Sequence, residues 1–367
     1  MALNCGIVGL PNVGKSTLFN ALTQSQSAET ANYAFCTIEP NSGTLAVPDP
    51  RLTRLAELVG AQKVIPAQLE IVDIAGLVKG ASKGAGLGNQ FLANIRETDA
   101  ILHLVRCFDG DVEHVEGRVD PVSDAETIST ELLLADLESL ERRIPALEKR
   151  RRGSDKEAAL LLPLLREIAD GLAHGQAARQ TAQHWDKAAQ ALLKSQQLLS
   201  AKPVLYIANV GEEELTSGNA YSQALEALAE AEGSVALRIS AAIEAEIAQI
   251  SDAAERQAFL DALGMTESGL ERLIRAAYGL LDLITFFTAG PKEARAWTLR
   301  NGARAPEAAG VIHSDFERGF IRAETIAYAD FDALGGEAAA KEAGKLRKEG
   351  KDYQVQDGDV LHVRFNL

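Results

Sequence analysis

The sequence predicts an α/β fold with a mostly parallel sheet, a helical insertion and a small C-terminal α+β domain. Short apolar runs alternate with helical stretches, which is the pattern of a parallel sheet covered by helices. The candidate strands are Cys5–Leu10, Gln68–Ile74, Ala100–Phe108, Val204–Asn209 and Val235–Ser240. One long interval in this series predicts the insertion, and a change of pattern after it predicts the separate C-terminal domain.

The insertion is predicted to be a helical hairpin. Apolar residues recur at the alternating steps of four and three that are typical of a coiled-coil seam. The first series is Leu133, Leu137, Leu140, Ile144 and Leu147, and the second is Leu161, Leu165, Ile168 and Leu172. The segment Arg150–Asp155 between them predicts the turn at the tip of two antiparallel arms. Pro145 and Pro163 lie inside the arms and are expected to kink or interrupt them.

Basic residues gather near the predicted tip of the arms. They are Arg142, Arg143, Lys149, Arg150, Arg151 and Arg152. On an acidic protein this cluster could contact RNA, and an ordinary solvated hairpin end is an equal alternative.

The C-terminal segment predicts a small α+β domain of the β-grasp type. Leu283–Phe287 and Ala294–Leu299 have strand patterns, and Pro306–Ile312 and Glu337–Glu349 have helical patterns. Tyr353–Phe365 predicts a closing hairpin, because Asp357-Gly358 is a favoured hairpin turn. The expected domains are residues 1–125 with 200–280, the inserted arms at 126–199, and the C-terminal domain at 281–367.

Composition limits the classes of protein and partner. No run approaches the roughly 20 apolar residues that span a bilayer, so we expect no membrane partner. Cys5, Cys36 and Cys107 lie far apart and fit a reducing cytoplasm. A net charge of −15 argues against non-specific coating of nucleic acid, so any RNA contact must use a local basic patch. We expect a cytoplasmic protein that does not bind DNA.

Residues 9–17, Gly-Leu-Pro-Asn-Val-Gly-Lys-Ser-Thr, form a complete P-loop motif between a predicted strand and a predicted helix. Glycines let the backbone N–H groups turn toward an anion, and the helix N-terminus adds partial positive charge. Lys15 is expected to reach the β- and γ-phosphates, and the Ser16 hydroxyl to bind Mg²⁺. A glycine turn that binds nothing is the alternative, and the complete motif disfavours it.

Two further elements predict a nucleotide switch. Asp73-Ile74-Ala75-Gly76 follows an apolar strand, where an Asp holds Mg²⁺ through water and the Gly N–H senses the γ-phosphate. Thr37 stands at about the distance after the P-loop at which a switch threonine closes on Mg²⁺. The glycine-rich stretch Leu77–Gly88 has the backbone freedom that a reorganising loop needs.

Leu77 stands where many switch GTPases place a glutamine that orients the attacking water. Leucine forms no hydrogen bond, so another group must position the water. His114, on a predicted loop, is one candidate, and a K⁺ ion held by Asn12 is another. His103 lies in an apolar strand and is expected in the core.

Asn209-Val210-Gly211-Glu212 occupies the place of the guanine-reading Asn-Lys-x-Asp element. The Lys is absent and the carboxylate is one methylene longer. A site without a well-placed pair of acceptors should lose most of its preference for guanine, which favours ATP over GTP. The segment Ser240-Ala241-Ala242, after the next strand, would supply backbone contacts to the base.

Together, Gly9–Thr17, Asp73–Phe91 and Asn209–Glu212 resemble the YchF / Obg-like ATPase family of translation-factor-type P-loop NTPases. The resemblance covers essentially the whole chain. It implies a P-loop NTPase G domain with inserted antiparallel coiled-coil arms and a C-terminal β-grasp, TGS-like domain. It also implies slow ATP hydrolysis, GTP as a secondary ligand, and association with ribosomes. Gly211 is a small departure, since a bulkier residue is common there.

We therefore expect a ribosome-associated switch that hydrolyses ATP to ADP and phosphate, with Mg²⁺ and K⁺ as cofactors and the ribosome or ribosomal RNA as partner. The alternatives are a GTP-preferring GTPase of the same fold, a P-loop kinase for a small substrate, and a non-catalytic RNA or protein adaptor. The expected nucleotide-binding residues are Asn12, Val13, Gly14, Lys15, Ser16, Thr17, Asn209, Val210, Glu212, Ser240, Ala241 and Ala242. The expected catalytic residues are Lys15, Asp73, Gly76 and His114. The expected metal ligands are Ser16, Thr37 and, through water, Asp73 for Mg²⁺, and Asn12 for K⁺.

Overall fold

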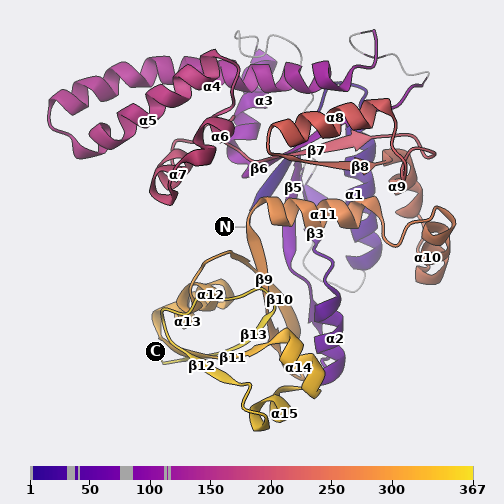
Figure 1. Cartoon of the computed structure of the whole chain (residues 1–367). Coiled ribbons are helices and arrows are strands. Elements are labelled where there is room, and N and C mark those ends of the chain that lie inside the picture. Colours follow the sequence, from indigo (N-terminus) through magenta and orange to yellow (C-terminus); the bar gives the residue numbers. More distant parts are fainter. Residues whose placement is uncertain are drawn as a thin grey trace.

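The computed structural model describes residues 3–30, 38–39, 42–74, 86–110, 114 and 117–366. This part of the chain forms two sheets and a pair of long helical arms that project beside the larger sheet (Figure 1). None of the described helices is long and apolar enough to cross a membrane. The predicted α/β architecture, with a helical insertion and a C-terminal β domain, is confirmed.

The larger sheet of the described chain has seven strands in the order β2-β3-β5-β1-β6-β7-β8. They are β1 (Asn4–Val8), β2 (Ile38–Glu39), β3 (Ser42–Ala46), β5 (Gln68–Asp73), β6 (Ala100–Arg106), β7 (Val204–Asn209) and β8 (Val235–Ile239). The strands from β5 to β8 in this order run parallel, whereas β2 and β3 add an antiparallel edge. The parallel strands are those that the sequence predicts.

Helices cover this sheet on both sides. Every residue of β6 and β7 is buried, as expected for parallel strands between two helical layers. In Figure 1, α4 (Pro121–Arg152) and α8 (Ala220–Ala231) lie on one side, and α11 (Gly269–Leu280) crosses on the other. The remaining helices of this part are α1 (Lys15–Thr30), α2 (Pro50–Val59), α3 (Gly86–Glu97), α9 (Ala241–Ile247) and α10 (Ala253–Ala262).

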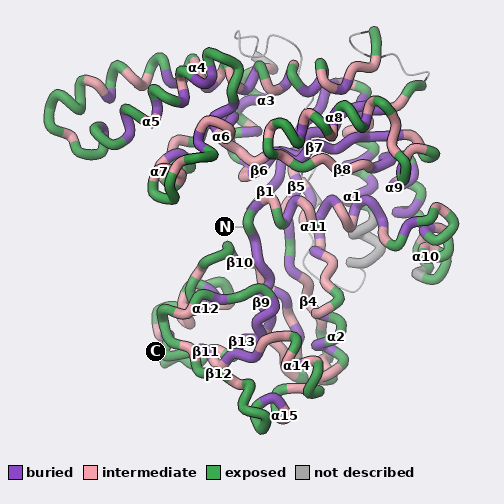
Figure 2. Tube along the Cα trace, viewed as in Figure 1, coloured by how far each residue is buried: buried purple, intermediate pink, exposed green. Residues whose placement is uncertain are grey.

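The arms are α4 and α5 (Lys156–Ala173), joined by a short turn at the predicted place. Their facing sides form a separate apolar cluster, while their outer sides are exposed (Figure 2). The cluster includes Leu140, Leu147, Leu162, Leu165, Ile168 and Leu172. Asp155 begins α5 by accepting a hydrogen bond of 3.1 Å from Ala158 N. The chain then returns to β7 through α6 (Ala178–Thr181), a 3₁₀ turn (Ala182–His184) and α7 (Lys187–Lys194).

The prolines were expected to kink or interrupt the arms; they do not interrupt them, and a kink at either proline stays a prediction. Pro145 lies inside α4 and Pro163 inside α5, and both helices continue through them. A proline leaves the carbonyl four residues earlier without its helical donor, and at an exposed position water can bind that carbonyl instead. Both prolines are exposed, so they lie away from the apolar cluster that holds the two helices together.

Asp136 attaches the base of the arms to the sheet. It is 1% exposed and accepts hydrogen bonds from Leu199 N (2.9 Å), Ser200 N (2.7 Å) and Ser200 Oγ (2.6 Å). Burial raises the pKa of this carboxyl group, although the three hydrogen bonds oppose that shift. The contact fixes the point at which the chain leaves the insertion and enters β7.

The smaller sheet of the described chain has six strands in the order β12-β11-β13-β9-β10-β4. They are β4 (Val64–Ile65), β9 (Leu283–Ala289), β10 (Ala294–Arg300), β11 (Phe320–Ala327), β12 (Arg347–Glu349) and β13 (Asp359–Phe365). Its helices are α12 (Ala305–Ile312), α13 (Ser314–Arg318), α14 (Tyr328–Leu334) and α15 (Glu337–Glu342). The predicted strands near 283 and 294 and the helix near 306 are present, whereas β11 was not predicted.

The predicted closing hairpin is wrong. β13 pairs antiparallel with β11 and parallel with β9, and not with the segment just before it. The Asp357-Gly358 turn is held from outside, because the Asp357 carboxylate accepts from Thr285 N (2.9 Å) and pairs with Arg51 (2.6 Å). Gly358 has φ +86°, a left-handed conformation that suits glycine.

The predicted helix Glu337–Glu349 is also too long. α15 ends at Glu342, and residues 347–349 form β12 instead. Gly344, at φ +72°, lies between the two elements and takes the left-handed conformation that commonly ends a helix.

Part of the N-terminal half lies against the smaller sheet. β4 pairs with β10, and α2 packs against β9, β10 and α14. The division of the chain at residues 125, 200 and 281 stays a prediction.

Candidate nucleotide-binding site

The predicted site residues come together because parallel strands end at one edge of the larger sheet. The P-loop follows β1, Asp73 ends β5, Asn209 ends β7 and Ser240 follows β8. The registers align these ends: Ile7 is opposite Asp73, and Asn209 is opposite Ile239. In open α/β sheets, ligands bind at the carboxyl edge of the strands.

The P-loop leads directly into α1. Leu18 N donates to Gly14 O at 3.0 Å, so the preceding amides in the first turn have no acceptor inside the helix. These N–H groups and the helix dipole form a site suited to phosphate. Asn12 has φ +65° and Gly14 has φ +94°, so both take left-handed conformations. Gly9 is required for close approach, since a Cβ there would lie 2.7 Å from Leu104 O.

Lys15 and Asp73 are bonded to each other. Lys15 Nζ donates to Asp73 Oδ1, and their side chains are 12% and 18% exposed. The contact places the Asp73 carboxylate beside the first turn of α1, facing the ammonium group of Lys15. Next to Lys15, the Ser16 side chain is exposed.

Asn209 joins three segments through its side-chain amide. Asn209 is 4% exposed; its Nδ2 donates to Val13 O (2.8 Å), and its Oδ1 accepts from Ala241 N (2.9 Å). A Cβ at Gly14 would collide with Asn209 Nδ2. The end of β7 is thus tied both to the P-loop and to the first residue of α9.

The predicted base-binding residues differ in exposure. Val210 and Ser240 are buried, and Val210 N donates to Ile239 O at 2.9 Å. Ala241 is also buried, whereas Glu212 and Ala242 are exposed. At Gly211, a Cβ would collide with the Glu214 carboxylate, so the side chain of Glu214 occupies the space that a bulkier residue would need.

Glu244 lies on α9, one turn after Ala241, and is 0% exposed. Its carboxyl group accepts from Gly269 N (2.7 Å) and Leu270 N (3.3 Å), the first residues of α11. Burial raises the pKa of Glu244 to about 7, against the opposing effects of the two amides and of Arg272. Sequence reasoning missed this residue, because a glutamate inside a short helix matches no motif.

The two histidines considered for the site are both buried. His114 Nε2 lies 2.8 Å from Asp124 Oδ2 on α4, and both side chains are almost completely covered. Its role in positioning water stays a prediction. His103 is a core residue, as predicted, and burial lowers its pKa to about 3.

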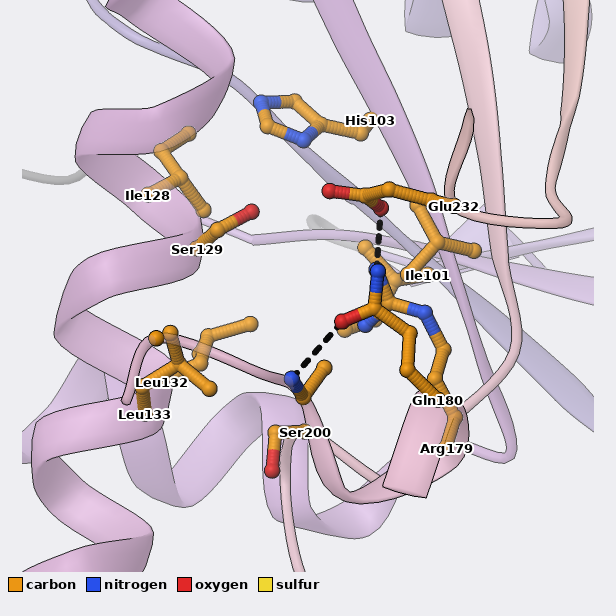
Figure 3. Close-up of a pocket in the computed structure, with 13 residues that line it drawn as sticks. Ile101, His103, Ile128, Ser129, Leu132, Leu133, Arg179, Gln180, Ser200 and Glu232 are labelled. Carbon is orange, nitrogen blue, oxygen red and sulfur yellow. Dashed lines mark hydrogen bonds and ion pairs between the residues drawn. The ribbon is translucent and has the colours of Figure 1, made fainter. Parts of the chain in front are cut away.

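His103 also lines a cavity of about 30 Å³ between the sheet and the arms (Figure 3). Arg179 pairs there with Glu232 at 2.5 Å, and Tyr206 Oη donates to the same carboxylate at 2.9 Å. Arg179 Nε is buried without a partner among the described residues. The lining is partly polar and partly apolar, the volume is that of one or two waters, and the residues lining the cavity include none of the P-loop.

Thr37, Gly76 and Leu77 lie outside the described residues, so their predicted roles remain predictions. The fold and the converging residues define a P-loop nucleoside triphosphatase with a G-domain core.

Comparisons with known proteins narrow this class. Residues 4–135 match a family model described as 50S ribosome-binding GTPase, and residues 283–366 match the YchF GTPase C-terminal model, described as a protein of unknown function. Proteins from Haemophilus ducreyi (58% identical over 368 residues) and Bacillus subtilis (54% over 370 residues) match over 100% of both chains. Each is named ribosome-binding ATPase YchF.

A solved structure has the same fold. The YchF GTPase of Schizosaccharomyces pombe superposes with a TM-score of 0.89 at 38% identity, over 99% of this chain and 97% of the other. The chain belongs to the YchF family.

Replacing Asn209 with Ala should weaken nucleotide binding by at least about tenfold, because Val13 O and Ala241 N lose their shared partner. Equilibrium binding of a fluorescent ATP analogue measures the effect. Asn219→Ala is the matched control, since that side chain contacts Cys107 O and caps α8 without touching the P-loop. Equal losses in both variants would show that the Asn209 contact has no special role.

Glu244 should make stability depend on pH. Its pKa is about 7 in the folded protein against an ordinary 4.5, so the folded state binds more protons between these values. The stabilisation is therefore complete below pH 4.5 and is lost as pH rises through about 7. Relative to Glu244→Gln, the wild-type free energy of unfolding should fall by up to about 3 kcal/mol between pH 5 and 8. Urea unfolding across this range measures the difference, and a flat or rising difference contradicts the assignment.

Proposed function

We propose that this chain is a ribosome-associated switch that hydrolyses ATP to ADP and phosphate. The observation that supports it most strongly is the Lys15–Asp73 contact at the start of α1, on the strand edge that Asn209 organises. The full-length relatives named ribosome-binding ATPases support the same function.

The residues at the P-loop fit a Mg²⁺ ion. Ser16 offers an exposed hydroxyl in the first turn of α1. Beside it, the Asp73 carboxylate is paired with the ammonium group of Lys15. Oxygen donors of this kind are the ligands that Mg²⁺ prefers. When bound, the metal would neutralise charge on the phosphate oxygens. We propose Thr37 as a further Mg²⁺ ligand and Asn12 as a K⁺ ligand.

The chain's own groups would bind and orient the triphosphate. Lys15 supplies positive charge to the phosphates, and the free amides of the first turn of α1 donate to their oxygens. In the structure Asp73 forms an ion pair with Lys15. Binding of the nucleotide with its metal would exchange this partner for phosphate and leave Asp73 to the metal's water shell.

Base selection rests on the edge formed by Asn209–Glu212 and Ser240–Ala242. The Glu212 side chain is exposed and one methylene longer than the usual guanine reader, and Val210 replaces the usual Lys. We propose a preference for ATP over GTP. GTP binding is the second candidate, because Glu212 retains a carboxylate and the Schizosaccharomyces pombe relative is called a GTPase.

The ribosome-facing surface is proposed to include the arm tip. Arg150 is paired with Asp155 and Glu157, but Lys149, Arg151 and Arg152 are exposed, and the described residues show no ion pair to them. In the C-terminal domain, Lys345 and Arg347 have acidic partners, whereas Lys348 and Lys351 are exposed and have no ion pair among the described residues. A partner in translation would also place the protein in the cytoplasm.

Lys15→Ala should abolish ATP turnover in the presence of Mg²⁺ and K⁺, because no other side chain supplies the P-loop charge. Release of inorganic phosphate from purified protein measures turnover. Lys156→Ala, an exposed lysine at the start of α5, is the control and should keep the wild-type rate. Undiminished turnover in Lys15→Ala, or no turnover in the wild type, would favour the adaptor alternative.

Dissociation constants for ATP and GTP, measured by calorimetry with Mg²⁺, test the base preference. We expect ATP to bind more tightly, since neither N1–H nor the 2-amino group of guanine has its usual acceptor. Tenfold tighter binding of GTP would overturn the preference. A preference that appears only with ribosomes would mean that the partner completes the base pocket.

Arg151→Ala combined with Arg152→Ala should reduce salt-sensitive co-sedimentation with ribosomes by several-fold, because each lost cation removes a phosphate contact. Lys187→Ala combined with Lys194→Ala removes two exposed charges from α7 and is the matched control. If the two double variants bind ribosomes equally well, the arm tip is a solvated hairpin end and not part of the ribosome-facing surface.

A further inference from the structure

Helices α9 and α11 connect the predicted base-binding segment Ser240–Ala242 to the smaller sheet. Ala241, the first residue of α9, donates its N–H to Asn209 Oδ1. One turn later, Glu244 accepts from the amides of Gly269 and Leu270, which open α11. The carboxyl group is therefore a joint between the helix that follows the base-binding segment and the helix that leads to β9.

The joint is tightly packed. A Cβ at Gly269 would lie 2.6 Å from Glu244 Oε1 and 3.3 Å from Ile239 Cγ1, so only glycine fits without displacement. α11 has a complete cap of its own, in which Ser268 and Glu271 exchange hydrogen bonds. Glu244 binds the two amides that this capping box leaves open. The charged groups that act on it are Glu271 and Arg272, both on α11.

The C-terminal end of α11 is also fixed to the smaller sheet by hydrogen bonds. Tyr278 Oη donates to Ile284 O (3.0 Å) and accepts from Thr285 Oγ1 (3.1 Å). Thr285 N donates to the Asp357 carboxylate, which pairs with Arg51 on α2. α11 is one continuous helix between the Glu244 joint and this second joint.

We propose that Glu244 is a positioning residue that couples occupancy of the nucleotide site to the structure of β9 in the smaller sheet. The proposal rests on the proposed function, because it requires a nucleotide at the P-loop and the base-binding segment. A ligand that orders the first turn of α9 fixes Glu244, which fixes the start of α11. A rigid helix bonded at both ends then passes the constraint to residues 283–285.

Hydrogen–deuterium exchange with mass spectrometry tests this, on the full chain with and without saturating Mg²⁺ and ATP. In the wild type, ATP should slow exchange in residues 283–289 by about fivefold or more. Glu244→Ala should lose at least half of that slowing. Glu244→Gln should lose less, because its amide oxygen can still accept from one of the two N–H groups.

Asp136→Asn is the matched control, since Asp136 is an equally buried carboxyl group that binds two backbone amides away from α9. It should keep the wild-type response. Gly269→Ala disturbs the same joint from the other side and should reproduce the loss, so the test does not depend on one variant folding.

A wild-type response in both Glu244→Ala and Gly269→Ala overturns the proposal. So does the absence of any ATP effect on residues 283–289 in wild-type protein that binds ATP. Equilibrium binding of ATP is measured in the same samples. If the wild type binds no ATP, the proposed function has failed. If it binds ATP without slower exchange in residues 283–289, only the proposed coupling has failed.

Discussion

The side-chain amide of Asn209 is the contact on which the arrangement of the site depends. A parallel sheet brings loop after loop to one edge, but it does not fix those loops relative to one another. Asn209 does so by donating to Val13 O and accepting from Ala241 N while it is almost completely buried. The constraint extends to Gly14, whose lack of a side chain leaves room for the amide. A motif residue usually assigned to base recognition is thus also a structural tie between the P-loop and α9.

The outer parts of the molecule are attached to this centre by a continuous apolar core and by the β4–β10 pairing, and a few polar contacts reinforce the attachment. Asp136 holds the return from the arms, and Glu244, Tyr278 and Asp357 form successive contacts toward the smaller sheet. Each satisfies backbone amides or carbonyls that burial would otherwise leave unpaired, at a cost of about 1–3 kcal/mol per group. Long arms and a distant sheet can therefore keep defined positions relative to the P-loop.

Local patterns in the sequence predicted the parallel strands, the arms, the P-loop and the placement of Asp73 and Asn209 at strand ends, because these depend on short-range periodicity and on glycine positions. The errors arose where contacts with residues far along the chain determine the local structure. The Asp357-Gly358 turn is held by Thr285 and Arg51 rather than by a hairpin partner, and β12 forms by pairing with β11. Pro145 and Pro163 face solvent, away from the apolar cluster between the arms, and both helices continue through them. Glu244 carries no motif, since its role depends on the start of α11, far along the chain.

The most direct measurement is a double-mutant cycle on the free energy of unfolding of the ligand-free chain, using Gly14→Ala, Asn209→Ala and the combined variant. The strain of a left-handed alanine is common to both backgrounds, so it cancels. The collision with Asn209 Nδ2 exists only when Asn209 is present. The account predicts that Gly14→Ala costs less in the Asn209→Ala background by about 1 kcal/mol or more. Additive effects would contradict the claim that Gly14 and Asn209 form one constraint.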